Sequence, residues 1–388
     1  MRMRMCLHRQ TVIRRRMEHQ RRGSALHSFA HITKGGVTRM HRLHCCLRQL
    51  ALMLTMLVTG QGMAAEVLRV LAWPGYADPD VVKVFEQRTG SRVEVTVIDS
   101  DESLWRRANG SGPTSFDVFA VNTAELQRYI RQGLVQPVDT TAISNRSRQL
   151  PRFRDLDNIP GIVHDGKAYA IPYTYAEMGL IYDRKQFETA PDSINVLWDP
   201  RYRGKILVYD GGAHNFALAG QSLGLPSLFQ LRDQDWPAAV ERLIALRRNT
   251  LSFYTQPQES ADMFIRLKAA LLFANFGSQQ LQLLRAADAD VGYAIPREGA
   301  LAWLDCWAVH RDSRNKALAE TWINYLLEDG PGAVLNNRQG LASTTRPASS
   351  SGNEDRLIWL EPVESAEQRN LLWGRIMSGD RASRVLAP

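Results

Sequence analysis

The chain has 388 residues, a formal net charge of +8 and a sequence pI near 9.4. Residues 1–64 hold twelve Lys and Arg but only one acid, so the remaining 324 residues carry 36 bases against 39 acids, a net charge of −3. The basic pI therefore belongs to the N-terminal segment, and the composition gives no reason to expect nucleic-acid or acidic-lipid binding.

An export signal is predicted in that N-terminal segment. Two arginines precede an apolar run at residues 50–58, and the small residues Gly62 and Ala64 follow it. The run is about half as long as the ~20 apolar residues that span a membrane. We therefore expect a cleaved leader, with residues 1–39 as an extended N-terminus or the product of a misplaced start codon, and an exported protein that begins near Ala65. An uncleaved membrane anchor is the alternative.

Strands and helices alternate through the first part of the exported chain. The predicted elements are a strand at 67–72, a helix at 78–89, a strand at 93–98, a helix from Asp99 through Trp105 with a capping box between Asp99 and Glu102, a strand at 116–121, a helix at 123–132 and an edge strand at 134–138. This alternation indicates a mainly parallel sheet with helices on both faces.

A second series of the same kind follows a β-rich run at 167–175, which Pro172 interrupts. Its predicted elements are a strand at 205–209, helices at 213–223 and 236–248, a strand at 251–254, a helix at 259–268, a strand at 270–274, a helix at 277–286, a strand at 291–296, a strand at 304–309 and a helix at 314–327. A chain that crosses near Pro172 and returns near Pro296 predicts two α/β lobes with a ligand cleft between them.

The expected organisation assigns each segment to a lobe. Residues 1–64 form the leader, 65–171 and 297–345 form lobe 1, 172–296 form lobe 2, and 346–388 form a C-terminal helical segment that packs on the lobes. Cys306 is the only cysteine after the leader, so no internal disulfide is expected and we interpret this thiol as a buried small apolar group.

The sequence carries no catalytic signature. Residues 220–224 match Gly-x-Ser-x-Gly around Ser222, but that motif requires a strand leading into a strained turn, and here it ends a predicted helix. The histidines after the leader, His164, His214 and His310, are widely separated and have no cysteine partners. We therefore expect no enzyme activity, no metal and no cofactor.

Several short motifs together resemble the periplasmic solute-binding proteins of ABC transporters, in particular the spermidine/putrescine-binding group. These motifs are Leu71-Ala-Trp-Pro-Gly-Tyr76, Phe85-Glu-Gln-Arg-Thr-Gly90, Asp99-Ser-Asp-Glu102, Phe116-Asp-Val118, Ala170-Ile-Pro-Tyr173, Leu197-Trp-Asp-Pro-Arg-Tyr-Arg-Gly-Lys205 and Trp303-Leu-Asp305. The resemblance implies a type II-like two-lobed fold, a monomer that captures a small cationic amine, and a membrane permease as partner.

In the polyamine-binding group, aromatic faces hold the methylene chain and carboxylates hold the ammonium ends. The resemblance carries these roles to Trp73 and Tyr76 as the first aromatic pair, to Trp303 as a cleft tryptophan, and to Asp305 and Asp210 as acids. A cation over such a ring gains about 0.5 to 2 kcal/mol.

Other positions depart from the family pattern. Gly75 stands where polyamine binders often have an acid, Asn122 replaces an aromatic residue, and Asn275 replaces a tryptophan at a position that we still place in the site. Glu177 could restore one lost acid. These differences favour putrescine or a smaller monoamine, such as a 4-carbon amino acid, over a long tetra-amine.

Each candidate also has a structural explanation. Trp73 could seal the core, Asp305 could form an internal salt bridge, Asp210 could cap the following helix, and Glu177 could lie on a solvent-facing strand.

The tyrosines of the crossing strand, Tyr173 and Tyr175, are two residues apart and are predicted to share one face. Hinge packing and cleft lining explain them equally well. At the level of function, the same fold could bind an amino acid, a thiamine-like compound or an anion, with Arg106, Arg107 or Arg297 holding a carboxylate. An enzyme on this scaffold is the remaining alternative.

Overall fold

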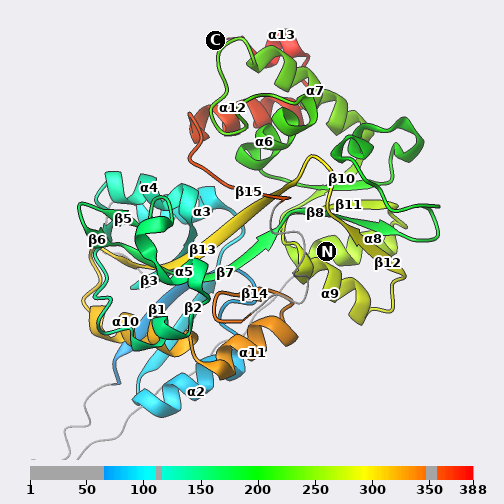
Figure 1. The fold of residues 1–388 in the computed structure, drawn as a ribbon. Helices are drawn as coiled ribbons and strands as arrows, with labels where there is room; N and C mark the ends of the chain where they lie inside the picture. Colours follow the sequence, from blue (N-terminus) through cyan, green and yellow to red (C-terminus); the bar gives the residue numbers. More distant parts are fainter. Residues whose placement is uncertain (1–64, 111–115, 347–355, 388) are drawn as a thin grey trace, which may run out of the picture. The chain divides into compact units, whose positions relative to one another are not determined.

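The computed structural model describes residues 65–110, 116–346 and 356–387. The predicted export signal lies outside these residues. In the described part, strands β1 to β15 form two large sheets with helices packed around them, together with a small two-stranded sheet of β5 (Val163–His164) and β6 (Lys167–Ala168) (Figure 1).

The first sheet has the strand order β14-β7-β13-β3-β1-β2, and β15 and β4 also pair with β13. Its strands and the helices near them in the chain are β1 (Val67–Ala72), α2 (Pro79–Thr89), β2 (Arg92–Val97), α3 (Asp101–Ala108), β3 (Val118–Asn122), α4 (Thr123–Arg131), β4 (Val135–Gln136), α5 (Pro151–Arg154), β7 (Ala170–Glu177), β13 (Ala300–His310), α10 (Lys316–Leu326), α11 (Asp329–Asn337), β14 (Ala342–Ser343) and β15 (Leu357–Trp359).

The second sheet has the strand order β10-β9-β11-β8-β12. Its elements are β8 (Gly179–Asp183), β9 (Ile206–Tyr209), α6 (Gly212–Leu223), α7 (Trp236–Asn249), β10 (Thr250–Tyr254), α8 (Pro257–Arg266), β11 (Leu271–Ala274), α9 (Ser278–Ala286) and β12 (Val291–Ala294). The C-terminal helices α12 (Ala366–Met377) and α13 (Ala382–Val385) follow, and α12 packs against α6 and α7.

The two sheets are mixed, whereas the sequence indicated mainly parallel sheets. The neighbours β2, β1 and β3 are parallel, and so are β10, β9 and β11. Strand β13 runs antiparallel to β3 and β7, and β8 runs antiparallel to β11 and β12. The cause is topological. The chain leaves the first sheet through β7 and returns through β13, so these neighbours must run in opposite directions.

The local sequence explains where the helices before the site begin and end. Asp78 caps α2 by accepting a hydrogen bond from the N–H of Asp80, and Gly90 ends it at a φ of 70°. Helix α3 begins after Ser100, whose hydroxyl oxygen accepts from the N–H of Ser103 at 3.2 Å. The capping box predicted between Asp99 and Glu102 is therefore wrong, because Ser100 takes the capping position.

The chain changes sheets between β7 and β8, and again between β12 and β13. The predicted boundary between residues 171 and 172 falls inside β7, and the one between 296 and 297 falls in the turn before β13. The lobe boundaries themselves stay a prediction. In the C-terminal segment, β15 extends the first sheet beside β13, while α12 lies on helices that follow the second sheet's strands.

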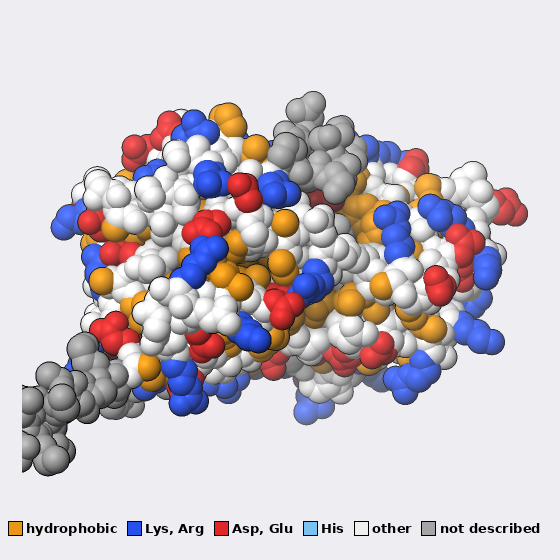
Figure 2. All heavy atoms as spheres, turned by 90° about the horizontal axis from the view of Figure 1, so that it is seen from below, with side chains coloured by type: hydrophobic (Ala, Val, Ile, Leu, Met, Phe, Trp, Pro, Cys, Tyr) orange, Lys and Arg blue, Asp and Glu red, His pale blue; other side chains and the backbone are white. Residues whose placement is uncertain are grey.

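The interior is apolar and the surface carries mixed charge. Cys306 is fully buried in β13, as expected for a small apolar group. On the face seen in Figure 2, cationic and anionic side chains are interspersed, which fits the small net charge of residues 65–388. None of the helices in the described part of the chain is long and apolar enough to cross a membrane.

Candidate functional site

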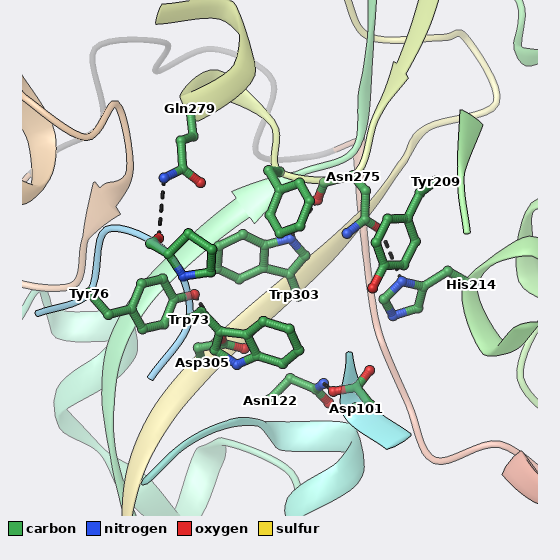
Figure 3. Close-up of a pocket in the computed structure, with 12 residues that line it drawn as sticks. Trp73, Tyr76, Asp101, Asn122, Tyr209, His214, Asn275, Gln279, Trp303 and Asp305 are labelled. Atoms are coloured by element: carbon green, nitrogen blue, oxygen red, sulfur yellow. Dashed lines mark hydrogen bonds between the residues drawn. The ribbon is translucent and has the colours of Figure 1, made fainter. Parts of the chain in front are cut away.

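A pocket lies where residues from both sheets meet, and it holds about 430 Å³ of space that is partly open to solvent (Figure 3). Its lining residues are Trp73, Pro74, Tyr76, Asp101, Asn122, Tyr209, His214, Asn275, Phe276, Gln279, Trp303 and Asp305. Five of the residues predicted from the sequence, namely Trp73, Tyr76, Asn275, Trp303 and Asp305, therefore come together here.

Most of the pocket is built from the carboxyl ends of parallel strands. In the first sheet, Trp73 directly follows β1 and Asn122 ends β3. In the second sheet, Tyr209 ends β9 and Asn275 directly follows β11. Parallel strands bring their carboxyl ends to the same edge of a sheet, where open α/β sheets bind ligands.

Strand β13 supplies the floor of the pocket. Trp303 and Asp305 are two residues apart and so project from the same face of this strand. The indole N–H of Trp303 donates to the backbone oxygen of Asn275 at 2.9 Å. This bond joins the first sheet to the loop after β11 in the second, so the ring of Trp303 is fixed by both.

Asp305 is a buried carboxylate with a neutral partner. Asp305 is only 6% exposed, and its Oδ2 accepts a hydrogen bond from the hydroxyl of Tyr76 at 2.5 Å. Among the residues that the structure describes, no cationic side chain forms an ion pair with it. The salt-bridge explanation for Asp305 is therefore not what the structure shows.

Burial disfavours the charged form of Asp305 and raises the pKa of this carboxyl group to about 7, with a smaller contribution from Asp101. The hydrogen bond from Tyr76 acts in the opposite direction. Burial and the neighbouring Asp305 raise the pKa of Tyr76 well above its usual value, so the phenol keeps its proton and remains a donor.

A second carboxylate, Asp101, lines the same pocket from the first turn of α3. The side-chain amide of Asn122 donates to its Oδ1 at 3.2 Å, while the Oδ1 of Asn122 caps α4 by accepting from the N–H of Glu125. The amide therefore has a fixed orientation. Burial, together with Glu102, raises the pKa of Asp101 above its usual value.

His214 faces the pocket as a neutral ring. Its Nδ1 lies 2.9 Å from the Oδ1 of Asn275. An amide oxygen can only accept, so Nδ1 carries the proton and Nε2 is left as an acceptor. Burial lowers the pKa of His214 to about 4, so the ring stays uncharged at neutral pH.

The loops that meet across the pocket depend on two glycines in the left-handed region. Gly75 has a φ of 86°, and a Cβ there would lie 2.8 Å from Oε1 of Gln339 and 2.9 Å from Nε2 of Gln279. Gly277 has a φ of 54°, and a Cβ would lie 2.6 Å from the backbone oxygen of Glu177. An acid at position 75 would therefore be strained by the positive φ and would displace the ends of Gln339 and Gln279.

Asp210 and Glu177 lie outside this pocket. The carboxylate of Asp210 accepts from the indole N–H of Trp373 at 2.7 Å and lines an adjoining cavity. Helix α6 begins after Gly211 without a side-chain cap, so Asp210 does not cap it either. Glu177 ends β7, and its backbone oxygen accepts from the hydroxyl of Tyr293.

The two tyrosines of β7 occupy opposite faces of the sheet, contrary to the prediction that they share one. Tyr173 packs against the rings of Tyr76 and Trp307, whereas Tyr175 packs against Phe153 and Trp359.

The cause is a break in the pairing of β7 with β13. Thr174 pairs with Asp305 and Pro172 with Cys306, so Tyr173 is an extra residue in a bulge. Pro172 has no N–H to donate to the ladder, which favours a bulge at this point. Neither tyrosine lines the pocket, although the hydroxyl of Tyr173 supports the site by donating to the backbone oxygen of Tyr76.

Sequence reasoning missed several lining residues, namely Pro74, Asp101, Tyr209, His214, Phe276 and Gln279. The signal that could have found Asp101 and Tyr209 is their place at the carboxyl ends of predicted parallel strands. Gln279 could be recognised only from the tertiary structure. It lies in α9, which belongs with the second sheet, and its amide donates to the backbone oxygen of Pro74, which follows β1 of the first sheet.

Among the described residues, the arginines and the Ser222 motif that the alternative hypotheses require do not lie at this pocket. No lysine or arginine lines it, so Arg106, Arg107 and Arg297 do not meet a ligand there. The structure contains no group of three or more His, Cys, Asp or Glu that could hold a metal within the described part of the chain. Ser222 lies within α6 and donates to the backbone oxygen of Ala219, so it does not occupy a strand-to-helix elbow.

The model of the family described as bacterial extracellular solute-binding protein matches residues 80–332, more than half of the chain. This chain belongs to that family. The putrescine-binding periplasmic protein PotF of Escherichia coli K12 is 29% identical over 315 residues, which cover 74% of this chain and 80% of PotF. The putrescine/cadaverine-binding protein of Pseudomonas aeruginosa is 23% identical over 317 residues, covering 78% and 86%.

Among solved structures, a putative spermidine/putrescine ABC transporter protein from Listeria monocytogenes superposes with a TM-score of 0.71 at 22% identity, covering 81% of this chain and 98% of that one. This similarity shows the fold. The two-lobed solute-binding architecture expected from the sequence is therefore confirmed.

Proposed function

We propose that this protein is the solute-binding component of an ABC importer, that it captures a small cationic amine such as putrescine, and that it delivers the amine to a membrane permease. The observation that carries the proposal is Asp305, a buried carboxylate that faces an aromatic pocket and has no cationic partner among the described residues. A buried charge without a partner is costly, and an ammonium group would supply that partner.

The pocket has the groups that bind an ammonium ion and a short methylene chain. A charge-assisted hydrogen bond to Asp305 contributes about 1.5 to 3 kcal/mol. Each of the rings of Trp73 and Trp303 contributes about 0.5 to 2 kcal/mol when a cation lies over its face. Burial of four methylene groups adds about 3 kcal/mol, so the sum is about 6 to 10 kcal/mol before the costs of ordering are subtracted, and it reaches the roughly 8 kcal/mol of a micromolar dissociation constant only at its upper end.

Relatives of this chain are named for putrescine, cadaverine and spermidine binding, which supports an amine as the solute class here. The proposal places the mature protein in the periplasm as a monomer after removal of residues 1–64, and it assigns no catalytic step. In this scheme the pocket binds and releases its solute unchanged.

One observation favours a second candidate solute. The indole N–H of Trp73 is buried and has no acceptor among the described residues, so a solute with a carboxylate, such as a 4-carbon amino acid, could accept from it. Such a carboxylate would lie in a pocket already lined by Asp101 and Asp305. Like charges at close range disfavour binding, so we rank this candidate below the amine.

Titration calorimetry of the purified protein with putrescine, 4-aminobutanoate and sulfate separates these possibilities. We expect a micromolar dissociation constant for putrescine and weaker binding of 4-aminobutanoate. Binding of sulfate with no binding of any amine would refute the proposal.

A further inference from the structure

The pocket contains a second acid whose role the proposed function leaves open. Asp101 is the first residue of α3, which follows β2 at the carboxyl edge of the first sheet. It lines the pocket together with Asp305, which belongs to strand β13. In Figure 3 the indole of Trp73 is drawn between these two carboxylates, with Trp303 above it.

The distance between the two acids can be bounded from the sheet. Asp305 in β13 pairs directly with Asn122 in β3, and Asn122 donates to Asp101. One strand spacing of about 5 Å plus the 3.2 Å hydrogen bond from Asn122 to Asp101 puts the two carboxyl groups on the order of 8 Å apart. A four-carbon diamine places its nitrogens about 6 Å apart when extended, and each N⁺–H···O⁻ bond adds about 2.8 Å. Such a molecule reaches from one acid to the other.

In the part of the chain that the structure describes, no cationic side chain forms an ion pair with Asp101. The acids Glu102 and Glu125 lie close enough to affect its titration or to be affected by it. Arg128 is the nearby base, but it pairs with Glu125 and Glu367 and stacks over the ring of Trp105. In the described residues no ion pair involves Asp101, so its carboxylate is left to pair with a cation that a solute brings.

His214 adds a neutral acceptor at the same end. Its ring lines this pocket and two adjoining cavities, and Asp101 lines all three with it. Because Nδ1 is the protonated nitrogen, Nε2 can accept a hydrogen bond. A carboxylate and an imidazole acceptor together suit an ammonium group, which has three N–H donors and no acceptor.

We propose that Asp101 holds the second ammonium group of a linear diamine, while Asp305 holds the first and the indoles of Trp73 and Trp303 cover the methylene chain between them. The inference rests on the proposed function, and it makes Asp101 the residue that selects a diamine over a monoamine. It also replaces the acid that the family pattern placed at Gly75 with one from a different loop. A 4-carbon amino acid fits poorly, because its carboxylate would meet Asp101.

The test compares putrescine with n-butylamine, which has the same four carbons and a single amine, by calorimetry on the parent protein and on Asp101→Asn. We expect the parent to bind putrescine more than tenfold more tightly than n-butylamine. In Asp101→Asn the affinity for putrescine should fall more than tenfold, while that for n-butylamine should change less than threefold. Asp99→Asn is the matched control, because Asp99 is exposed two residues earlier and its loss should change neither affinity.

Equal affinities of the parent for the two amines would overturn the inference without any variant. It would also be overturned if Asp101→Asn weakened both amines equally, or if spermidine bound the parent more than tenfold more tightly than putrescine. A parent protein that binds no amine at all would instead refute the proposed function. The unliganded variant should melt no lower than the parent, since it loses a half-buried carboxylate among other acids.

Discussion

Because Asp305 must be ionised to bind a cation, the affinity for putrescine should depend strongly on pH. In the unliganded protein its pKa is about 7, whereas the amine, like a lysine side chain, stays charged below about pH 10. The ionised fraction of Asp305 rises from roughly 1% at pH 5 to roughly 90% at pH 8. The ionisation of Asp305 alone should therefore raise the association constant roughly 90-fold over this range, equivalent to about 2.7 kcal/mol.

The variant Asp305→Asn removes the pH dependence of putrescine affinity that arises from Asp305, so comparing it with the parent tests the assignment. At pH 8 the variant should bind putrescine more than tenfold more weakly than the parent, because a charge-assisted bond worth about 1.5 to 3 kcal/mol is lost. At pH 5 the two proteins should bind about equally, since the parent carboxyl group is protonated there. Asp101, whose pKa is also raised, leaves a smaller pH dependence in the variant.

Calorimetric titrations of both proteins at half-unit steps from pH 5 to 8 measure this convergence. Parallel curves, in which the variant is weaker by the same factor at every pH, would refute the reasoning that Asp305 titrates near neutral pH. His214 adds no pH dependence of its own between pH 5 and 8, because its pKa of about 4 keeps the ring neutral over this range.

Three further outcomes are expected. The unliganded protein should lose stability as the pH rises from 5 to 8, because between the unfolded pKa near 3.8 and the folded pKa near 7 the folded state binds the proton on Asp305 more tightly. Asp305 alone would contribute about 2.6 kcal/mol of this loss between pH 5 and 8, and urea denaturation should show a loss smaller by about that amount in Asp305→Asn, where Asp101 and Glu125 still have raised pKa values. Gly277→Ala should destabilise the protein by about 1 to 3 kcal/mol. The loss should exceed that of Gly90→Ala, where a Cβ meets nothing within 4 Å. Equal melting temperatures for the two variants would contradict the close contact of position 277 with the backbone oxygen of Glu177. N-terminal sequencing of periplasmic protein should give a start within a few residues of Ala65, and a start before residue 50 would indicate an uncleaved anchor.

The sequence predicted those elements whose pattern is local. The strand at 67–72 and the helix that Gly90 ends appear as expected, because alternation, capping and a left-handed glycine act within a few residues. The antiparallel direction of β13 and the pairing of β8 could not be predicted in this way. They depend on where the chain returns between sheets, which no short window of sequence records.

The candidate site was predicted in part for the same reason. Trp73, Trp303 and Asp305 stand in recognisable motifs, and the structure brings them together. Tyr175 was misplaced because a one-residue bulge at Tyr173 reverses the faces of the residues that follow. Asp101 was overlooked because its neighbourhood suggested only a helix start, and an acid in a first helical turn ordinarily has that structural explanation.

The contrast between Gly75 and Asp101 shows why the charge of a binding pocket cannot be counted position by position. Comparison with the family pattern marks Gly75 as the loss of an acid and so suggests a less cationic solute. The loops after β1 and β2 nevertheless converge at one edge of the sheet, since these strands are parallel neighbours. An acid lost from one loop can therefore be offset by an acid on the other, and the pocket still contains two carboxylates, Asp101 and Asp305. The charge that a solute must bring is set by the sum of the groups lining the cavity, which only the fold reveals.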